Sequence, residues 1–136
     1  MTTAGSHPID EYVRVAEFRS ALRRFLGGTE RVARSFGLTP QRYLLLLMIK
    51  GAPDGSEFST VTELSERLQL AQSTVTELVA RAEDAGLITR RPSRDDGRVA
   101  LLRLTDEGER RLELAFTGLE TERQQLLASL VNLERR

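Results

Sequence analysis

The stretch Leu64–Leu104, LSERLQLAQSTVTELVARAEDAGLITRRPSRDDGRVALLRL, decides the fold of this chain. It opens with a short helical pattern, followed by a turn at Ala71–Ser73. A second helical pattern runs from about Gln72 to Ala85, and Gly86 can end that helix. Two strand-like runs follow, separated by a loop that carries an Asp-Gly turn signal. The stretch therefore predicts a helix, a turn, a second helix and a β-hairpin, in that order.

The predicted hairpin is strongly basic. Its strands span Leu87–Arg91 and Val99–Leu104, and the segment Ile88–Leu104 holds five arginines against two aspartates. The next segment, Thr105–Glu122, has the opposite sign, with six acids against two arginines. The net charge of the chain is zero, but its distribution predicts one region that attracts phosphate beside another that repels it.

Two helices are predicted at the N-terminal side of this stretch. Ile9–Phe36 has the apolar spacing of a long amphipathic helix, and Gly27-Gly28 inside it predicts a kink or a close backbone contact. Thr39-Pro40 is a helix start, with threonine as N-cap and proline at the first helical position. That helix extends to about Lys50 and is apolar on nearly every side, so we expect it to be buried.

Two further threonines mark helix starts. Thr60–Glu63 fits a capping box and opens a short helix that ends near Leu70. Thr105 caps a final long helix, with Asp106 and Glu107 favourably placed in its first turn. The predicted fold class is therefore mainly α with a small β-hairpin: a winged helix-turn-helix domain between long N- and C-terminal helices.

Composition restricts the class of protein. At 136 residues the chain is long enough for one domain with its own core. It has no cysteine, which excludes disulfides, thiolate metal sites and cysteine redox sensing, and the single histidine, His7, argues against a zinc or other metal site. The longest apolar run, Tyr43–Ile49, is too short to cross a bilayer, and Met1–Asp10 shows no signal peptide, so we expect a cytoplasmic protein.

The helix from Gln72 has the pattern of a DNA recognition helix. Its apolar residues Val75, Leu78, Val79 and Ala82 fall at i, i+3, i+4 and i+7, and so face the core. Small polar residues occupy the opposite face near the N-terminus, where hydroxyls and free backbone N–H groups can take phosphate oxygens. An ordinary capped surface helix has the same pattern, so this helix alone does not decide the function.

The hairpin directly after this helix favours DNA binding. Arg90, Arg91, Arg94 and Arg98 fall within nine residues that include a tight turn. An arginine at such a tip can enter a narrow minor groove, where the negative potential is enhanced. Asp96 stands two residues before Arg98 and can brace its guanidinium by a charge-assisted hydrogen bond.

Several short pieces of the chain have the order and spacing of a known family. They are Leu38–Gln41, Glu63–Leu68, Ser73–Thr76, Leu78-Val79 with Arg81, Gly86–Ile88, Asp96–Arg98, and Leu104-Thr105 with Gly108. On these pieces, residues 39–108 resemble the MarR family of winged-helix transcription regulators. The terminal helices resemble that family only in length and pattern.

The resemblance implies a homodimer that binds double-stranded DNA. Residues 9–37 and 106–136 would form the intertwined dimerisation helices, and residues 39–105 the winged helix-turn-helix lobe. It also implies a pseudo-palindromic operator and, usually, a repressor released by a small molecule, often an aromatic acid. The residues themselves favour a dimer too, because two long amphipathic helices have more apolar face than one small domain covers. A two-fold dimer reads two half-sites roughly 34–36 Å apart, or a multiple of that spacing.

The residues expected to contact DNA lie on the recognition helix and the hairpin. They are Gln72, Ser73, Thr74, Thr76, Glu77, Arg81, Arg90, Arg91, Arg94, Asp96 and Arg98. Two positions depart from the family pattern. Glu77 stands where members often carry a basic residue, and it can accept from a cytosine amino group or discourage wrong sequences. Ala71 stands where relatives often carry Ser or Asp, so an N-cap worth about 0.5–2 kcal/mol is lost unless Gln72 or Ser73 replaces it.

Family ligands commonly occupy a cleft between the dimerisation helices and the DNA-binding lobe. The candidate lining residues here are Tyr12, Phe18, Arg42, Tyr43, Leu46 and Phe58. Arg42 can take a carboxylate, and the aromatic side chains can sandwich a ring. The alternative is that Tyr43, Leu46 and Phe58 simply belong to the core.

Other functions compete with a ligand-responsive repressor. A ligand-independent or architectural DNA-binding protein would bind any duplex with similar affinity and a salt slope of about −0.9 per phosphate neutralised. An activator of the same fold is a further alternative. An enzyme is not expected, because the chain has no phosphate-binding Gly-rich loop, nucleophile–histidine pair or metal cluster, and no cofactor is predicted.

Overall fold

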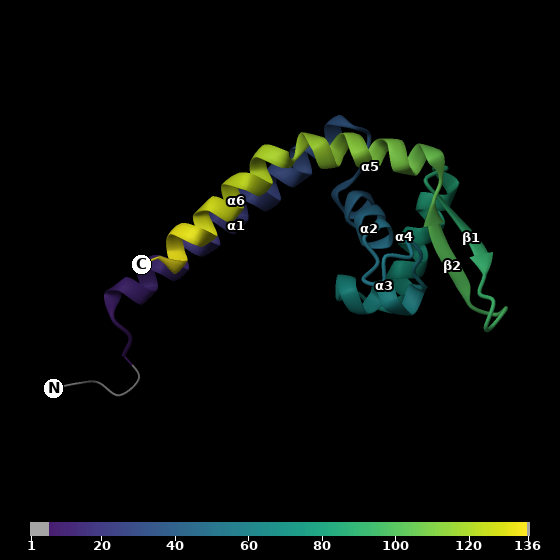
Figure 1. Ribbon diagram of the computed structural model, residues 1–136, viewed down its shortest axis with the longest axis horizontal. Coiled ribbons are helices and arrows are strands. Elements are labelled where there is room, and N and C mark those ends of the chain that lie inside the picture. Colours follow the sequence, from purple (N-terminus) through teal and green to yellow (C-terminus); the bar gives the residue numbers. More distant parts are fainter. Residues whose placement is uncertain (1–5, 136) are drawn as a thin grey trace.

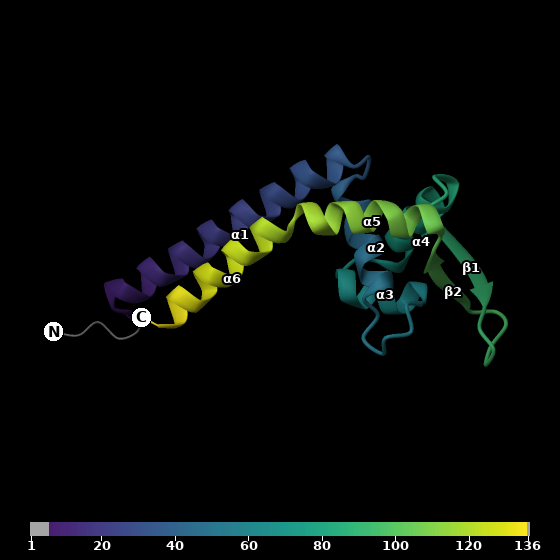
Figure 2. The same cartoon turned by 45° about the horizontal axis from the view of Figure 1, so that its top comes forward.

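The computed structural model describes residues 6–135. The elements in chain order are α1 (Ile9–Ser35), α2 (Pro40–Lys50), α3 (Val61–Leu68), α4 (Gln72–Asp84), β1 (Ile88–Pro92), β2 (Ala100–Leu104), α5 (Asp106–Gly118) and α6 (Glu120–Glu134). Figures 1 and 2 show a lobe made by α2–α5 and the hairpin, from which α1 and α6 extend side by side as an arm. The predicted fold, mainly α with a winged hairpin, is confirmed.

The core of the lobe is centred on α2. Leu45, Leu46 and Ile49 of this helix have no exposed surface, as its apolar composition predicts. Buried residues of the neighbouring elements pack around them; they include Leu64, Val75, Val79, Leu87, Leu102, Leu112, Ala115 and Leu119. Because α5 contributes Leu112 and Ala115, it belongs to the same packed unit as the recognition helix and the hairpin.

Three of the predicted helix starts are confirmed by their hydrogen bonds. The Thr39 hydroxyl accepts from the backbone N–H of Arg42 at 3.1 Å, and Pro40 follows at the first helical position. Thr60 and Glu63 form the reciprocal capping box, with bonds of 3.1 and 2.9 Å. Thr105 caps α5 by accepting from the N–H of Gly108 at 3.1 Å.

The start of α4 lacks such a cap. Ala71 is the N-cap residue and no side chain accepts a hydrogen bond there, so neither Gln72 nor Ser73 replaces the lost cap. The turn lies slightly earlier than predicted, at Gln69–Ala71, because α4 already begins at Gln72. Gln69 ends α3 in the left-handed conformation, with φ of 57°.

The hairpin is a two-stranded antiparallel sheet. Ile88 pairs with Leu104 and Pro92 with Ala100, which leaves residues 93–99 as the loop. Ser59 adds a bridge to the outer edge of β2, where it exchanges backbone hydrogen bonds of 2.8 and 3.1 Å with Leu102. The segment before α3 therefore holds the hairpin against the lobe.

The prediction of one continuous C-terminal helix is wrong. The helix breaks at Leu119, and the bend between α5 and α6 is visible in Figure 1. Gly118 lies so close to α1 that a Cβ at this position would be 2.9 Å from Val32 Cγ1 and 3.1 Å from Phe36 Cε2. The break lets α5 remain in the lobe while α6 follows α1.

The glycine pair in α1 makes a close contact rather than a break. The helix continues through Gly27 and Gly28. A Cβ on Gly28 would lie 2.9 Å from Glu122 Cγ of α6, so this glycine allows the two helices of the arm to approach. None of the described helices combines the length and the apolar character needed to cross a membrane.

Candidate nucleic-acid interface

The exposed side of α4 and the hairpin form one surface, here named the α4–hairpin face. Val75, Val79 and Ala82 have no exposed surface and turn α4 toward the core. The predicted DNA-contacting residues of this helix are all exposed on its other side: Gln72, Ser73, Thr74, Thr76, Glu77 and Arg81. The hairpin lies beside α4 in both views of the fold (Figures 1 and 2).

The N-terminal turn of α4 is open to a ligand. Because no side chain caps it, its first backbone N–H groups can hydrogen-bond to an anion such as a phosphate. The Gln72 amide Nε2 donates to the Thr62 hydroxyl of α3 at 3.3 Å. That bond links the two helices of the helix-turn-helix at the exposed surface.

The two charged residues of the predicted recognition face are paired with each other. Arg81 Nη2 lies 2.8 Å from Glu77 Oε1, one helical turn away, and both side chains are well exposed. This i, i+4 arrangement places the carboxylate N-terminal to the guanidinium, which is the favourable order on a helix.

Arg90 of β1 is bound to Glu83 of α4. Its Nε donates to both carboxylate oxygens at 2.9 Å, and its Nη2 donates to Oε1. The hydrogen bonds from this guanidinium lower the pKa of the Glu83 carboxyl, and the carboxylate raises the pKa of Arg90. Glu83 was not among the residues predicted from sequence, and this pair ties the hairpin to the recognition helix.

The hairpin loop is organised by Asp96. Its carboxylate accepts from the backbone N–H of Arg98 at 3.0 Å and from the Arg98 Nε at 3.3 Å, so the predicted brace is confirmed. The Asp96 carbonyl accepts from the N–H of Val99 at 3.0 Å, which closes the turn. The Arg98 side chain nevertheless remains 93% exposed. Arg94 is also exposed and forms no ion pair within the part of the chain that the structure describes.

The ring of Phe58 supports two arginines of the hairpin. The guanidinium carbon of Arg91 lies 4.4 Å from the ring centroid, and that of Arg103 lies 5.4 Å away. These are cation–π distances. Phe58, which was predicted to line a ligand cleft, thus contacts two arginines of the hairpin through its ring.

A charged junction holds the loop before Phe58. Lys50, the one lysine of the chain, contacts Glu57 and donates to Glu109 of α5 at 3.0 Å. The hydrogen bonds that Lys50 donates to both carboxylates raise the pKa of Lys50, and Lys50 lowers the pKa of Glu57. Glu57 has a φ of 65°, a conformation that a non-glycine residue rarely adopts. The junction therefore joins α2, the loop and α5 at the base of the hairpin.

The six candidate ligand residues come from α1, from α2 and from the loop before α3. Tyr12 and Phe18 lie on α1 and are exposed. Tyr43 and Leu46 are buried in the core, and burial raises the pKa of the Tyr43 phenol. Arg42 is half-buried in the first turn of α2. The core alternative considered for Tyr43 and Leu46 is the one the structure shows.

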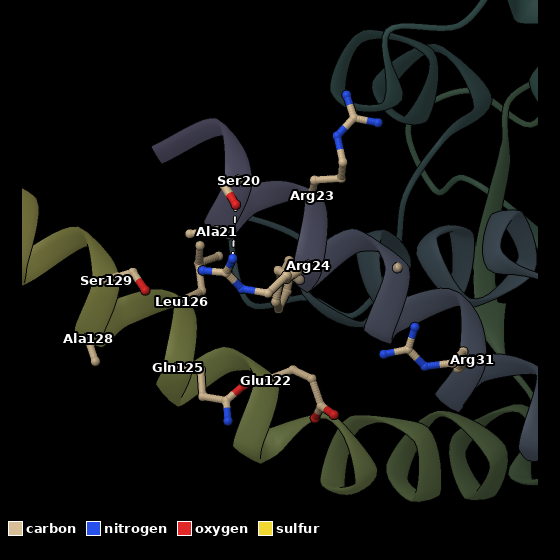
Figure 3. Close-up of a pocket in the computed structure, with 12 residues that line it drawn as sticks. Ser20, Ala21, Arg23, Arg24, Arg31, Glu122, Gln125, Leu126, Ala128 and Ser129 are labelled. Atoms are coloured by element: carbon tan, nitrogen blue, oxygen red, sulfur yellow. Dashed lines mark hydrogen bonds between the residues drawn. The ribbon is translucent and has the colours of Figure 1, made fainter. Parts of the chain in front are cut away.

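A groove of about 830 Å³ lies elsewhere, between α1 and α6 (Figure 3). Its lining includes Arg23, Arg24 and Arg31 of α1, and Glu122, Gln125 and Leu126 of α6. Arg24 donates to the Ser20 hydroxyl at 2.9 Å along the groove. None of the six predicted ligand residues lines it. Among residues 6–135, no three His, Cys, Asp or Glu side chains gather as metal ligands would.

Comparison with known proteins identifies relatives of this chain. A family model described as MarR family matches residues 36–99. The organic hydroperoxide resistance transcriptional regulator of Bacillus subtilis is 38% identical over 71 residues, which are 52% of this chain and 46% of the relative. The chain spans only about half the length of the curated relatives it matches.

Solved structures with this fold include a transcriptional regulator from Thermotoga maritima. It is 30% identical, with a TM-score of 0.65 over 88% of this chain and 80% of that one. A mutant MarR from E. coli in complex with operator DNA is 19% identical, with a TM-score of 0.69 over 96% of this chain and 97% of that one. The latter likeness concerns the fold.

Proposed function

This chain belongs to the MarR family of winged-helix transcriptional regulators, and from that premise we propose that it is a homodimeric repressor that binds a pseudo-palindromic operator in double-stranded DNA. The observation that carries the proposal is the α4–hairpin face. It combines a helix that presents Ser73, Thr74 and Thr76 on its exposed side with a hairpin that carries arginines at its loop. A solved relative of the same fold is in complex with operator DNA.

The proposed contacts follow from the position of each residue. Ser73, Thr74 and Thr76 lie at the start of α4, where a helix inserted in the major groove meets base edges and phosphates. Arg98 and Arg94 lie on the hairpin loop and would reach the adjacent minor groove or the backbone. Arg90 and Asp96 act differently, since each holds another charged residue of this face in place.

The arm supports the proposed dimer. It consists of α1 and α6, and none of the described residues of α6 is buried. Large apolar side chains along it are exposed; they include Ile9, Tyr12, Val15 and Phe18 of α1 and Leu127 and Val131 of α6. An exposed apolar surface of this kind marks an interaction site. A second copy of the arm would cover it and would set two recognition helices at the spacing of two half-sites.

Release by a small-molecule effector is the remaining part of the proposal, and it rests on the family alone. None of the six residues predicted to line an effector cleft lines the groove between α1 and α6, and the proposal assigns the effector to none of them. Release of bound DNA in a screen of aromatic acids would test this part independently.

Binding to DNA that flanks the protein's own coding region tests the main proposal. The affinity for these duplexes would be compared with that for random duplex at one stated salt concentration. We expect a preference of about a thousandfold or more for one flanking sequence. Equal affinity for every duplex, including duplexes selected from a random library, would contradict a specific repressor and favour the architectural alternative. Sedimentation of the free protein would test the dimer.

A further inference from the structure

Carboxylates of the α4–hairpin face bind arginines of the same face. Glu77 is paired with Arg81, and Glu83 is paired with Arg90. DNA binding through phosphates requires free positive charge, so an arginine that already neutralises a carboxylate contributes little to it. This self-pairing is unexpected for a surface meant to attract a polyanion.

The Glu83–Arg90 pair is the more strongly constrained of the two. Three hydrogen bonds join the guanidinium to the carboxylate, and the Glu83 side chain is only 26% exposed. A bidentate arginine–carboxylate pair is strong and geometrically specific. A phosphate that approaches Arg90 must therefore displace Glu83 or bind the guanidinium N–H groups that do not bond to Glu83.

The Glu77–Arg81 pair lies directly on the predicted base-reading side of α4. Both side chains are 64% exposed and are joined by one bond of 2.8 Å. Such an exposed pair is weak, so a contact of matching geometry can open it. A guanine edge, which accepts two hydrogen bonds from an arginine, is one such contact.

We propose that Glu77 and Glu83 are specificity-determining residues that compete with DNA phosphates for Arg81 and Arg90 and so suppress binding to sequences other than the operator. The inference rests on the proposed DNA-binding function. Binding to random DNA depends almost entirely on phosphate contacts and counterion release, and a neutral pair releases no counterions. The two carboxylates weaken operator binding less than random binding. At the operator, base contacts supply binding free energy that another sequence does not offer.

The test uses the full chain and charge-neutral variants of the same shape. Affinity for a random duplex is measured over a range of salt concentrations for Glu77→Gln, Glu83→Gln and the double variant. We expect each single variant to bind random duplex about two- to fivefold more tightly. The dependence of log affinity on log salt should steepen by about 0.9 for each arginine released. The ratio of operator to random affinity should fall.

Two controls separate pairing from simple charge. Asp84→Asn removes a neighbouring exposed carboxylate of α4 that has no ion pair within residues 6–135. Glu113→Gln removes an exposed carboxylate on α5. Both should change the affinity and the salt slope less than Glu83→Gln does. Thermal unfolding of each variant would verify that the fold is retained.

The outcomes are distinct. If Glu83→Gln and Asp84→Asn have equal effects, or if the double variant behaves as the wild type does, the competition is overturned while the DNA-binding function stands. If the wild-type chain binds no duplex at low salt, the proposed function itself is overturned. If the double variant gains affinity for random duplex, steepens the salt slope and loses discrimination, the proposal is supported.

Discussion

Gly108 lies directly against the backbone of Leu87: a Cβ on residue 108 would be only 2.2 Å from the Leu87 carbonyl oxygen. The same oxygen accepts from the N–H of Thr105 at 3.0 Å, and the Thr105 hydroxyl donates to the Gly86 carbonyl at 2.6 Å. The first turn of α5 is thus joined to the segment where α4 ends and the hairpin begins. This contact holds the start of α5 against the residues that lead into the hairpin.

Replacing Gly108 with alanine should destabilise the protein by about 2 kcal/mol. Inside a helix, alanine is normally favoured over glycine by about 1 kcal/mol. Overpacking costs about 1–3 kcal/mol, and a clash with backbone lies at the upper end of that range. The overpacking cost therefore exceeds the propensity gain by about 2 kcal/mol. The Leu87 carbonyl cannot move away without breaking its bond to Thr105. Urea denaturation would measure the loss. Gly97→Ala is the matched control, since its Cβ meets no atom within 4 Å, and equal stabilities of the two variants would contradict the prediction.

Restoring an N-cap at Ala71 should stabilise the protein. Ala71 already has the extended conformation of an N-cap residue, with φ of −63° and ψ of 148°, but it offers no side-chain acceptor. Ala71→Ser should therefore add about 0.5–1 kcal/mol to the free energy of unfolding. Ala80→Ser, at an exposed position inside the same helix, should instead cost about 0.5 kcal/mol. A higher free energy of unfolding for both variants would show that the N-cap is not the cause of the stabilisation.

Removing the Arg98 side chain should weaken operator binding without unfolding the protein. The side chain is 93% exposed, and within residues 6–135 its one ion pair is with Asp96 of the same loop, so we expect the fold to be retained without it. Arg98→Ala should cost about 1–3 kcal/mol of binding free energy. Arg110→Ala removes an arginine from the exposed side of α5 and serves as control. Unchanged affinity of a folded Arg98→Ala variant would contradict the role assigned to the hairpin loop.

The Phe58 ring should matter for DNA binding through the arginine above it. Phe58→Leu keeps an apolar side chain but removes the π-face beneath Arg91, so we expect about two- to fivefold weaker binding, which corresponds to a cation–π contact of about 0.5–1 kcal/mol. Phe58→Tyr keeps the face and should bind as the wild type does. A leucine variant with wild-type affinity would show that the ring only fills space.

Acid should weaken the start of α5. Hydrogen bonds from Arg110 and Arg111 lower the pKa of the Glu107 carboxyl to about 2 from an ordinary 4.5. A carboxyl whose pKa is depressed by folding stabilises the folded state above pH 4.5, and this contribution disappears as the pH falls toward 2. Glu107→Gln should therefore flatten the fall in stability over that range. Glu113→Gln is the control, and identical pH profiles for both variants would refute the assignment.

The order of the elements and most of their ends could be predicted from the sequence. Thr39, Thr60 and Thr105 begin helices because each hydroxyl bonds to a backbone N–H three residues away, and this interaction depends only on neighbours in the chain. The hydrogen bond from the Arg98 backbone N–H to the Asp96 carboxylate likewise joins residues that are close in the chain. Apolar spacing likewise placed Val75, Val79 and Ala82 in the core, since helical periodicity assigns each position a face.

Only the tertiary structure decided which of these residues meet. The bond of Glu83 to Arg90, the contact of Phe58 with Arg91 and the break at Leu119 all depend on how separate elements pack. The same packing buries Tyr43 and Leu46 in the core and leaves Tyr12 exposed on α1. Local propensity acts over a few residues, whereas these relationships arise from the shape of the core and from close approaches such as Gly108 to Leu87. The sequence thus determined the kind of surface, and the fold determined which charges on it are free.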